Sequence, residues 1–180
     1  MNLNEKTISS EMIFDGKVVK LHLDKIVLPD GSEAVREVLS HPGGVGVLAI
    51  DEDNNVLMVR QFRTAAKQVM LEIPAGKLEY DENPLECGIR ELEEEAAAVA
   101  EEIIPLGYFF PTPAYAEEKI YLFFAKGLSY TKQNLDDGEF LAVERIPFDE
   151  LYEMALNGDI IDAKTLIAIL KAKKFVCPKG

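Results

Sequence analysis

The segment from Gly76 to Ala98, GKLEYDENPLECGIRELEEEAAA, constrains the fold and the chemistry of this chain more than any other. Asn83 can cap a helix that has Pro84 at its first position, so we predict a helix that runs to about Ala98. At helical spacing, one apolar stripe gathers five residues: Leu85, Ile89, Leu92, Ala96 and Val99.

Three carboxylates of this helix, Glu91, Glu94 and Glu95, share an arc beside the apolar stripe. Like charges at this spacing repel, and hard cations such as Mg²⁺ or Mn²⁺ turn the repulsion into coordination by oxygen. A solvated acidic helix face is the competing interpretation. The preceding turn, Ile73–Gly76, favours a metal site, because a backbone carbonyl can approach there as a further ligand.

Composition limits the classes of protein that this chain can belong to. Its 180 residues are 48% hydrophobic and 28% charged, as in a globular domain, and its net charge of −13 argues against nucleic acid as a partner. No apolar run reaches the about 18 residues that span a membrane. Cys87 and Cys177 are the only cysteines and their spacing suggests no pair, so we expect a reduced, cytoplasmic setting.

Turn residues and apolar patterns predict an α+β fold with a mixed sheet between helices. Residues 17–28 and 34–39 form an expected N-terminal antiparallel hairpin, and His41–Gly44 marks a boundary between segment 1–41 and a main domain, 42–180. A second, more central hairpin is predicted from Val45–Ile50 and Val56–Phe62. The remaining predicted elements are strands at 103–110, 119–125 and 140–146 and helices at 148–157 and 162–173.

The helix and the turn before it resemble the signature of the Nudix hydrolases. Seven of that signature's eight fixed positions are matched, by Gly76, Glu82, Arg90, Glu91, Leu92, Glu94 and Glu95. Ala97 stands where the family has Gly. If this residue ends the helix in a left-handed conformation, Ala costs about 1 kcal/mol there. The resemblance implies the Nudix fold, a mixed β-sheet sandwiched between α-helices.

Most of the chain resembles the ADP-ribose pyrophosphatase branch of that family. The matching segments are Arg36–Val38, His41–Gly43, Val59–Arg63, Leu71–Gly76, the marker Pro113 and Asp136–Phe140, with departures at Ala114 and Asp137. This resemblance implies Mg²⁺-dependent hydrolysis, with Mn²⁺ as an alternative ion, of ADP-ribose to AMP and ribose 5-phosphate. Other nucleotide sugars, dinucleoside polyphosphates, or binding without turnover as an ADP-ribose sensor are the alternatives.

The resemblance also implies roles for the acidic residues. Glu91 and Glu95 would bind the metal with the carbonyl of Ala75, while Glu82 and Arg90 would orient these ligands. Glu94 and Glu139 are further candidates among the catalytic carboxylates for metal binding. For the general base, the matched positions favour Asp137 or Glu139, and Glu118 of the earlier loop is a rival.

Arg36, Arg63, Glu72 and Pro113 match positions at the substrate in this branch, where guanidinium groups suit phosphate oxygens. The aromatic residue that stacks on the base stays open among Phe14, Phe62 and Tyr115. We expect a homodimer, because the N-terminal hairpin is too small to form a core alone and in this branch packs on a partner.

Overall fold

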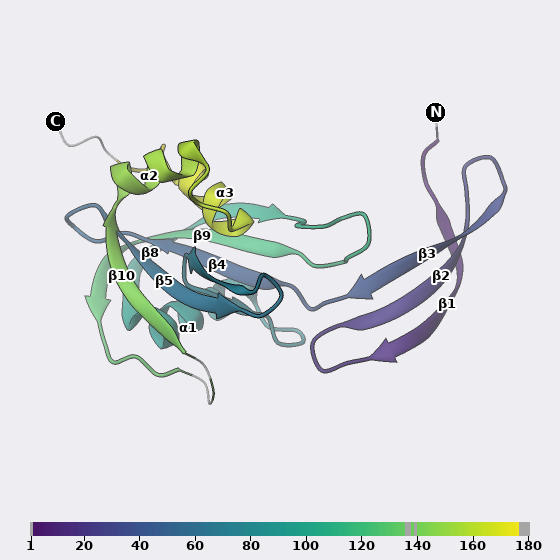
Figure 1. Cartoon of the computed structure of the whole chain (residues 1–180), viewed down its shortest axis with the longest axis horizontal. Helices are drawn as coiled ribbons and strands as arrows, with labels where there is room; N and C mark the ends of the chain where they lie inside the picture. The colour runs from purple at the N-terminus through teal and green to yellow at the C-terminus, as the bar shows by residue number, and fades with distance from the viewer. Residues whose placement is uncertain (1, 136–137, 139, 177–180) are drawn as a thin grey trace. The chain divides into compact units, whose positions relative to one another are not determined.

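The computed structural model describes residues 2–135, 138 and 140–176, in two compact units (Figure 1). The first unit comprises Met1–Gly43 and Phe110–Lys119, and the second comprises Gly44–Phe109 and Ile120–Gly180. The elements of the first unit are β1 (Lys6–Asp15), β2 (Lys20–Val27) and β3 (Glu33–Ser40). Those of the second are β4 (Gly44–Ala49), β5 (Asn55–Arg63), β6 (Gln68–Glu72), β7 (Ala75–Lys77), α1 (Pro84–Ala96), β8 (Ala98–Phe109), β9 (Ile120–Tyr130), β10 (Leu141–Pro147), α2 (Phe148–Asn157) and α3 (Ala163–Ala172).

The first unit is an antiparallel sheet in the order β1-β2-β3. The predicted hairpin is confirmed as β2 and β3, with Lys20 opposite Ser40 and Val27 opposite Glu33. The strand β1 was not predicted. Register shifts between Thr7 and Ser9 and between Met12 and Phe14 interrupt its period of two, which is the pattern that identifies a strand in a sequence.

The second unit contains two sheets. One has the order β7-β4-β9-β8 and is mixed, because β4 and β9 are parallel while the other pairs are antiparallel. The other has the order β10-β5-β6 and is antiparallel. The predicted second hairpin is therefore wrong: β4 and β5 share a single bridge, Ile50 to Val56, and then enter different sheets.

Residues of β4 alternate between two cores, which explains why this strand is buried throughout. Val45 and Val47 pack in a core with residues of α1, whereas Leu48 packs in a core with residues of α2 and α3. In Figure 1, α1 covers one face of this sheet and α2 and α3 cover the other. Full burial of such side chains stabilises the fold by about 1.5–3 kcal/mol each. The expected sheet between helices is confirmed.

The helix α1 begins as predicted, with Asn83 Oδ1 accepting a hydrogen bond from the N–H of Leu85 at 2.8 Å. Its predicted apolar stripe is wrong at Leu85 and Ile89, which are 40% and 42% exposed, and at Val99, which lies in β8 because the helix ends at Ala96. The buried face instead carries Cys87, Gly88, Leu92, Glu95 and Ala96. At Gly88 a Cβ would lie 3.3 Å from the Val47 side chain, so small residues let the helix approach the sheet.

Candidate active site

The turn between β6 and α1 brings the backbone of Ala75 and Gly76 against two carboxylates of the helix. Val47 N–H donates to the carbonyl of Pro74 at 2.9 Å, and β7 pairs with β4, so the turn is held on the edge of the mixed sheet. Glu95 is 2% exposed, and its Oε2 accepts a hydrogen bond from the Ala75 N–H at 2.8 Å. A buried carboxylate is thus aimed at the turn.

Gly76 is required by the position of Glu91. A Cβ at residue 76 would lie 1.9 Å from both Cδ and Oε1 of Glu91, a separation that atoms do not tolerate. Only glycine lets this carboxylate approach the backbone so closely. Glu91 and Glu95 therefore converge on the same two residues of the turn, and Glu91 itself is 13% exposed.

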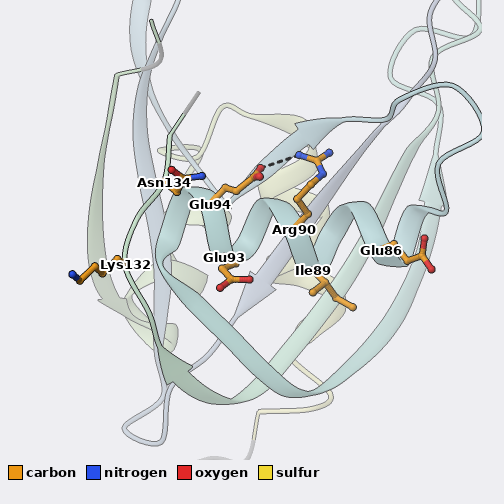
Figure 2. A pocket seen from close by; sticks show the side chains of 7 residues that line it. All are labelled: Glu86, Ile89, Arg90, Glu93, Glu94, Lys132 and Asn134. Carbon is orange, nitrogen blue, oxygen red and sulfur yellow. Dashed lines mark hydrogen bonds and ion pairs between the residues drawn. The ribbon is translucent and has the colours of Figure 1, made fainter. Parts of the chain in front are cut away.

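Arg90 lies among the acidic groups and forms three ion pairs. Its guanidinium is 3.2 Å from Glu82, 2.8 Å from Glu91 and 2.9 Å from Glu94. Burial alone would lower the pKa of Arg90, but the hydrogen bond with Glu82 and the charge of Glu91 outweigh it and raise that pKa. Figure 2 shows Arg90 and Glu94 on one side of α1, whereas Glu93 projects from the other side.

Glu82 connects this cluster to the loop before the helix. Its Oε2 accepts a hydrogen bond from the Glu79 N–H at 2.8 Å. Burial works to raise the pKa of Glu82, but this bond and the bonds from Arg90 prevail, so the pKa lies below its ordinary value. Cys87 beside it is free and buried, and burial with a hydrogen bond to Glu82 raises the pKa of its thiol to about 12. The thiol is therefore protonated at neutral pH.

A second cluster lies at the end of β6. Glu72, which is 1% exposed, accepts hydrogen bonds from Nε and Nη2 of Arg63, both at 2.8 Å, and forms an ion pair with Lys164. Burial raises the pKa of Glu72, but the hydrogen bond from Arg63 and the charge of Lys164 bring it below its ordinary value. The bond with Glu72 in turn raises the pKa of Arg63, although burial opposes this.

Lys164, Asp162 and Thr165 belong to this cluster and were not among the predicted site residues. The sequence indicates a helix start near Asp162, which the structure confirms as the cap of α3. No local pattern links that helix start to Glu72, because the two segments are 92 residues apart at Lys164. Their contact is a product of the tertiary fold.

The predicted residues divide among three places. The second unit holds the residues of both clusters. The first cluster comprises Ala75, Glu82, Arg90, Glu91, Glu94 and Glu95, and the second includes Arg63 and Glu72. Arg36, Pro113 and Glu118 belong to the first unit, where Arg36 pairs with Glu5 at 2.6 Å and Glu118 lies 3.6 Å from His41. Asp137 and Glu139 lie outside the described residues, as does Cys177.

The segment that precedes Asp136 is attached to the end of α1 by two hydrogen bonds. The Asn134 N–H donates to the carbonyl of Glu94 at 3.0 Å, and Gln133 Nε2 donates to the carbonyl of Glu95 at 2.7 Å. Both carbonyls belong to the last turn of the helix, where backbone acceptors lack helical partners. Residues Gln133 and Asn134 therefore lie at the end of α1 that carries Glu94 and Glu95.

The donor atoms fit a hard divalent cation. Glu91 and Glu95 carry carboxylate oxygens beside the backbone of the turn, and carboxylate and carbonyl oxygens are the ligands that Mg²⁺ and Mn²⁺ prefer. Among residues 2–135, 138 and 140–176, no three Asp, Glu, His or Cys side chains are already gathered as a metal site. Arg90 instead engages Glu91 and Glu94, so metal binding requires these carboxylates to reorient.

A family model described as the NUDIX domain matches residues 40–168. The chain belongs to the Nudix family. A model described as a nucleoside diphosphate sugar hydrolase N-terminal domain matches residues 5–39. Nudix hydrolases use divalent metal ions, which agrees with the oxygen donors of the turn and the helix.

Related proteins cover nearly the whole chain. An ADP-ribose pyrophosphatase of Bacillus subtilis (strain 168) is 39% identical over 170 residues, which cover 93% of this chain and 92% of the relative. A methanol dehydrogenase activator of Bacillus methanolicus is 44% identical over 168 residues, covering 92% and 90%. This Nudix protein is a pyrophosphohydrolase related to ADP-ribose pyrophosphatases, as the resemblance predicted.

A solved structure confirms the predicted Nudix fold. The crystal structure of an ADP compounds hydrolase superposes with a TM-score of 0.84 at 18% identity, covering 97% of this chain and 96% of that one. No helix in the described part of the Nudix chain has both the length and the hydropathy to cross a membrane.

Proposed function

We propose that the protein hydrolyses the pyrophosphate bond of ADP-ribose to AMP and ribose 5-phosphate with Mg²⁺ as its metal ion. One observation carries the proposal: Glu91 and Glu95 converge on the Ala75–Gly76 backbone. The 39% identity to an ADP-ribose pyrophosphatase favours this substrate. When bound, Mg²⁺ supplies the positive charge that offsets the diphosphate, which bare carboxylates would repel.

The proposed roles of the protein groups follow from their contacts. Glu91, Glu95 and the Ala75 carbonyl hold the ion, with Mn²⁺ as a substitute. Arg90 restrains Glu91 and links it to Glu82, whose own position is tied to the Glu79 backbone. Arg90 thereby connects Glu91 to the loop before the helix, and the metal-binding carboxylates reorient toward the ion when it binds.

The substrate needs cations of the protein as well as the metal ion. Arg63 uses Nε and Nη2 for Glu72, so Nη1 is the nitrogen that Glu72 does not engage. We propose that this group binds a phosphate oxygen. The base that activates water is Asp137 or Glu139, with Glu118 as the rival, and Glu94, which pairs with Arg90, is a further candidate metal ligand.

The test is a product assay with ADP-ribose in isotopically labelled water. Glu95→Gln retains an acceptor for the Ala75 N–H but removes the charge. We expect kcat to fall about 100-fold or more, because several kcal/mol of charge stabilisation are lost. Glu93→Gln is the matched control, an exposed acid of the same helix that projects away from Arg90. Equal activity of the two variants would refute the assignment of the site.

A panel of substrates tests the alternative activities, which are the hydrolysis of other nucleotide sugars or dinucleoside polyphosphates and binding without turnover. GDP-mannose and dinucleoside polyphosphates should be cleaved more slowly than ADP-ribose. GDP-mannose is included because a GDP-mannose pyrophosphatase of an Enterobacter species is 28% identical over 182 residues. A higher kcat/KM for GDP-mannose than for ADP-ribose would identify GDP-mannose as the substrate. Calorimetric binding of ADP-ribose with Mg²⁺ but without products would instead identify a sensor.

A second candidate function is the regulation of a dehydrogenase. The 44% identity to a methanol dehydrogenase activator favours it. The rate of alcohol oxidation by purified methanol dehydrogenase from Bacillus methanolicus should rise when the protein is added. Glu95→Gln then distinguishes two routes: activation that is lost with the carboxylate depends on hydrolysis, whereas retained activation depends on binding alone.

We also propose a cytoplasmic homodimer. The free, buried Cys87 agrees with a reducing compartment. Among the described residues of the first unit, Ile26 is the only buried side chain, while Ile8, Ile13 and Phe14 are at least 50% exposed. Such an apolar sheet gains stability from a second copy. Light scattering coupled to size exclusion should give twice the 20.0 kDa chain mass, and a mass of one chain would refute the dimer.

A further inference from the structure

The first turn of α3 combines a helix cap with a partly buried cation. Asp162 Oδ2 accepts hydrogen bonds from the N–H of Thr165 at 3.0 Å and from its hydroxyl at 2.6 Å. Lys164 Nζ donates to Asp162 Oδ1 at 3.1 Å and to Glu72, and its side chain is 14% exposed. A cap alone requires only Asp162, so the burial of Lys164 needs a separate explanation.

Stability is a poor explanation for this burial. Removing a lysine and a glutamate from water costs several kcal/mol per ion, and apolar residues of similar size often replace such pairs without loss. The ion pair does, however, fix the direction of Glu72, whose two oxygens accept from Arg63 and Lys164 together. A fixed Glu72 in turn fixes the guanidinium plane of Arg63.

The same turn of α3 also holds the backbone that leads to the metal ligands. The Ile73 N–H donates to Thr165 Oγ1 at 2.9 Å, and Thr165 is fully buried. Two residues later, the Ala75 N–H donates to Glu95 Oε2 at 2.8 Å. The segment Ile73–Ala75 is therefore bound at Ile73 to α3 and at Ala75 to α1.

We propose that Asp162, Lys164 and Thr165 are positioning residues for the hydrolysis. Lys164 acts through Glu72 on Arg63, and Thr165 acts through the Ile73 amide on the turn that carries Ala75. Asp162 holds the other two in place. The inference rests on the proposed function for its catalytic consequence, whereas the attachment of the turn to α3 is measurable without substrate.

Lys164→Met tests the route through Arg63. We expect kcat/KM for ADP-ribose to fall about 10- to 100-fold, mainly through KM, because Arg63 binds substrate. Lys164→Arg keeps the charge and should restore most of the activity. Lys126→Met is the matched control, since it removes the exposed Lys126–Glu102 pair and should leave activity unchanged. Wild-type kinetics for Lys164→Met would overturn the role of this lysine.

The combination with Arg63→Ala shows whether Lys164 acts through Arg63. In the Arg63→Ala background, Lys164→Met should change kcat/KM by about twofold or less, because residues that act as a unit are not additive. The same fold-loss in both backgrounds would overturn this route.

Amide hydrogen exchange of the substrate-free protein tests the role of Thr165. In Thr165→Val, the amides of Ile73 and Ala75 should both exchange about tenfold faster, and Thr165→Ser should restore their protection. Faster exchange at Ile73 alone would overturn the inference. Coupled exchange in a protein that does not cleave ADP-ribose would instead refute the proposed function and leave the attachment to α3 standing.

Discussion

Ala97 offers a direct test of how the end of α1 is held. It follows the helix with φ 52° and ψ 36°, in the left-handed region that side chains with a Cβ rarely adopt. Two hydrogen bonds hold it there: its N–H donates to the carbonyl of Glu93 at 3.0 Å, and its carbonyl accepts from the Thr131 N–H at 2.8 Å. The conformation is thus imposed by the surrounding chain.

Ala97→Gly should stabilise the protein. Relief of the left-handed strain contributes about 1–2 kcal/mol, and the greater freedom of glycine in the unfolded chain offsets about 0.5–1 kcal/mol. The net gain is about 0.5–1 kcal/mol, which for a chain of this length raises Tm by about 1–4 °C. Activity should change little, because both hydrogen bonds remain.

Differential scanning calorimetry and urea unfolding measure this effect, with Ala96→Gly as the matched control. Ala96 is right-handed, helical and 6% exposed, so the same chemical change should lower stability by about 1 kcal/mol or more. Opposite signs at adjacent positions would identify the backbone conformation as the cause. A lower Tm for Ala97→Gly would refute the reasoning.

Two further predictions concern the clusters around the turn. Gly76→Ala should retain its circular dichroism spectrum yet lose about 100-fold in kcat, because a Cβ 1.9 Å from the Glu91 carboxylate displaces that ligand; wild-type kcat would contradict this. The pKa of Glu72 is lowered in the folded state, so its contribution to stability is present above the ordinary value of 4.5 and is lost as pH falls below it. Urea midpoints from about pH 7 to about pH 3.5 should therefore fall less steeply for Glu72→Gln than for the wild type, and parallel curves would contradict this.

Local signals in the sequence were sufficient to predict the helix α1. The cap at Asn83, Pro84 at the first helical position and the spacing of Glu91, Glu94 and Glu95 depend on contacts within a few residues. The same holds for the hairpin β2–β3, whose strands are joined by a short turn. These elements were predicted because the interactions that form them are close along the chain.

Contacts between distant segments determine the strand pairing and the burial of Glu95, which local patterns do not predict. The strands β4 and β5 share the apolar pattern of a hairpin, yet each finds its partners elsewhere in the chain. Glu95 belongs to an acidic arc by spacing, but only packing against the turn makes it buried and bound to Ala75.

Lys164 shows most clearly what required the tertiary structure. Nothing near it in the sequence indicates a carboxylate partner, and its position beside Glu72 arises when α3 packs on the sheet. Periodicity and capping describe one element at a time. Local patterns were therefore enough to show which carboxylates share one arc of α1, while the packing of β4, β6 and α3 decided which groups contact them and the turn, because those contacts join segments far apart in the chain.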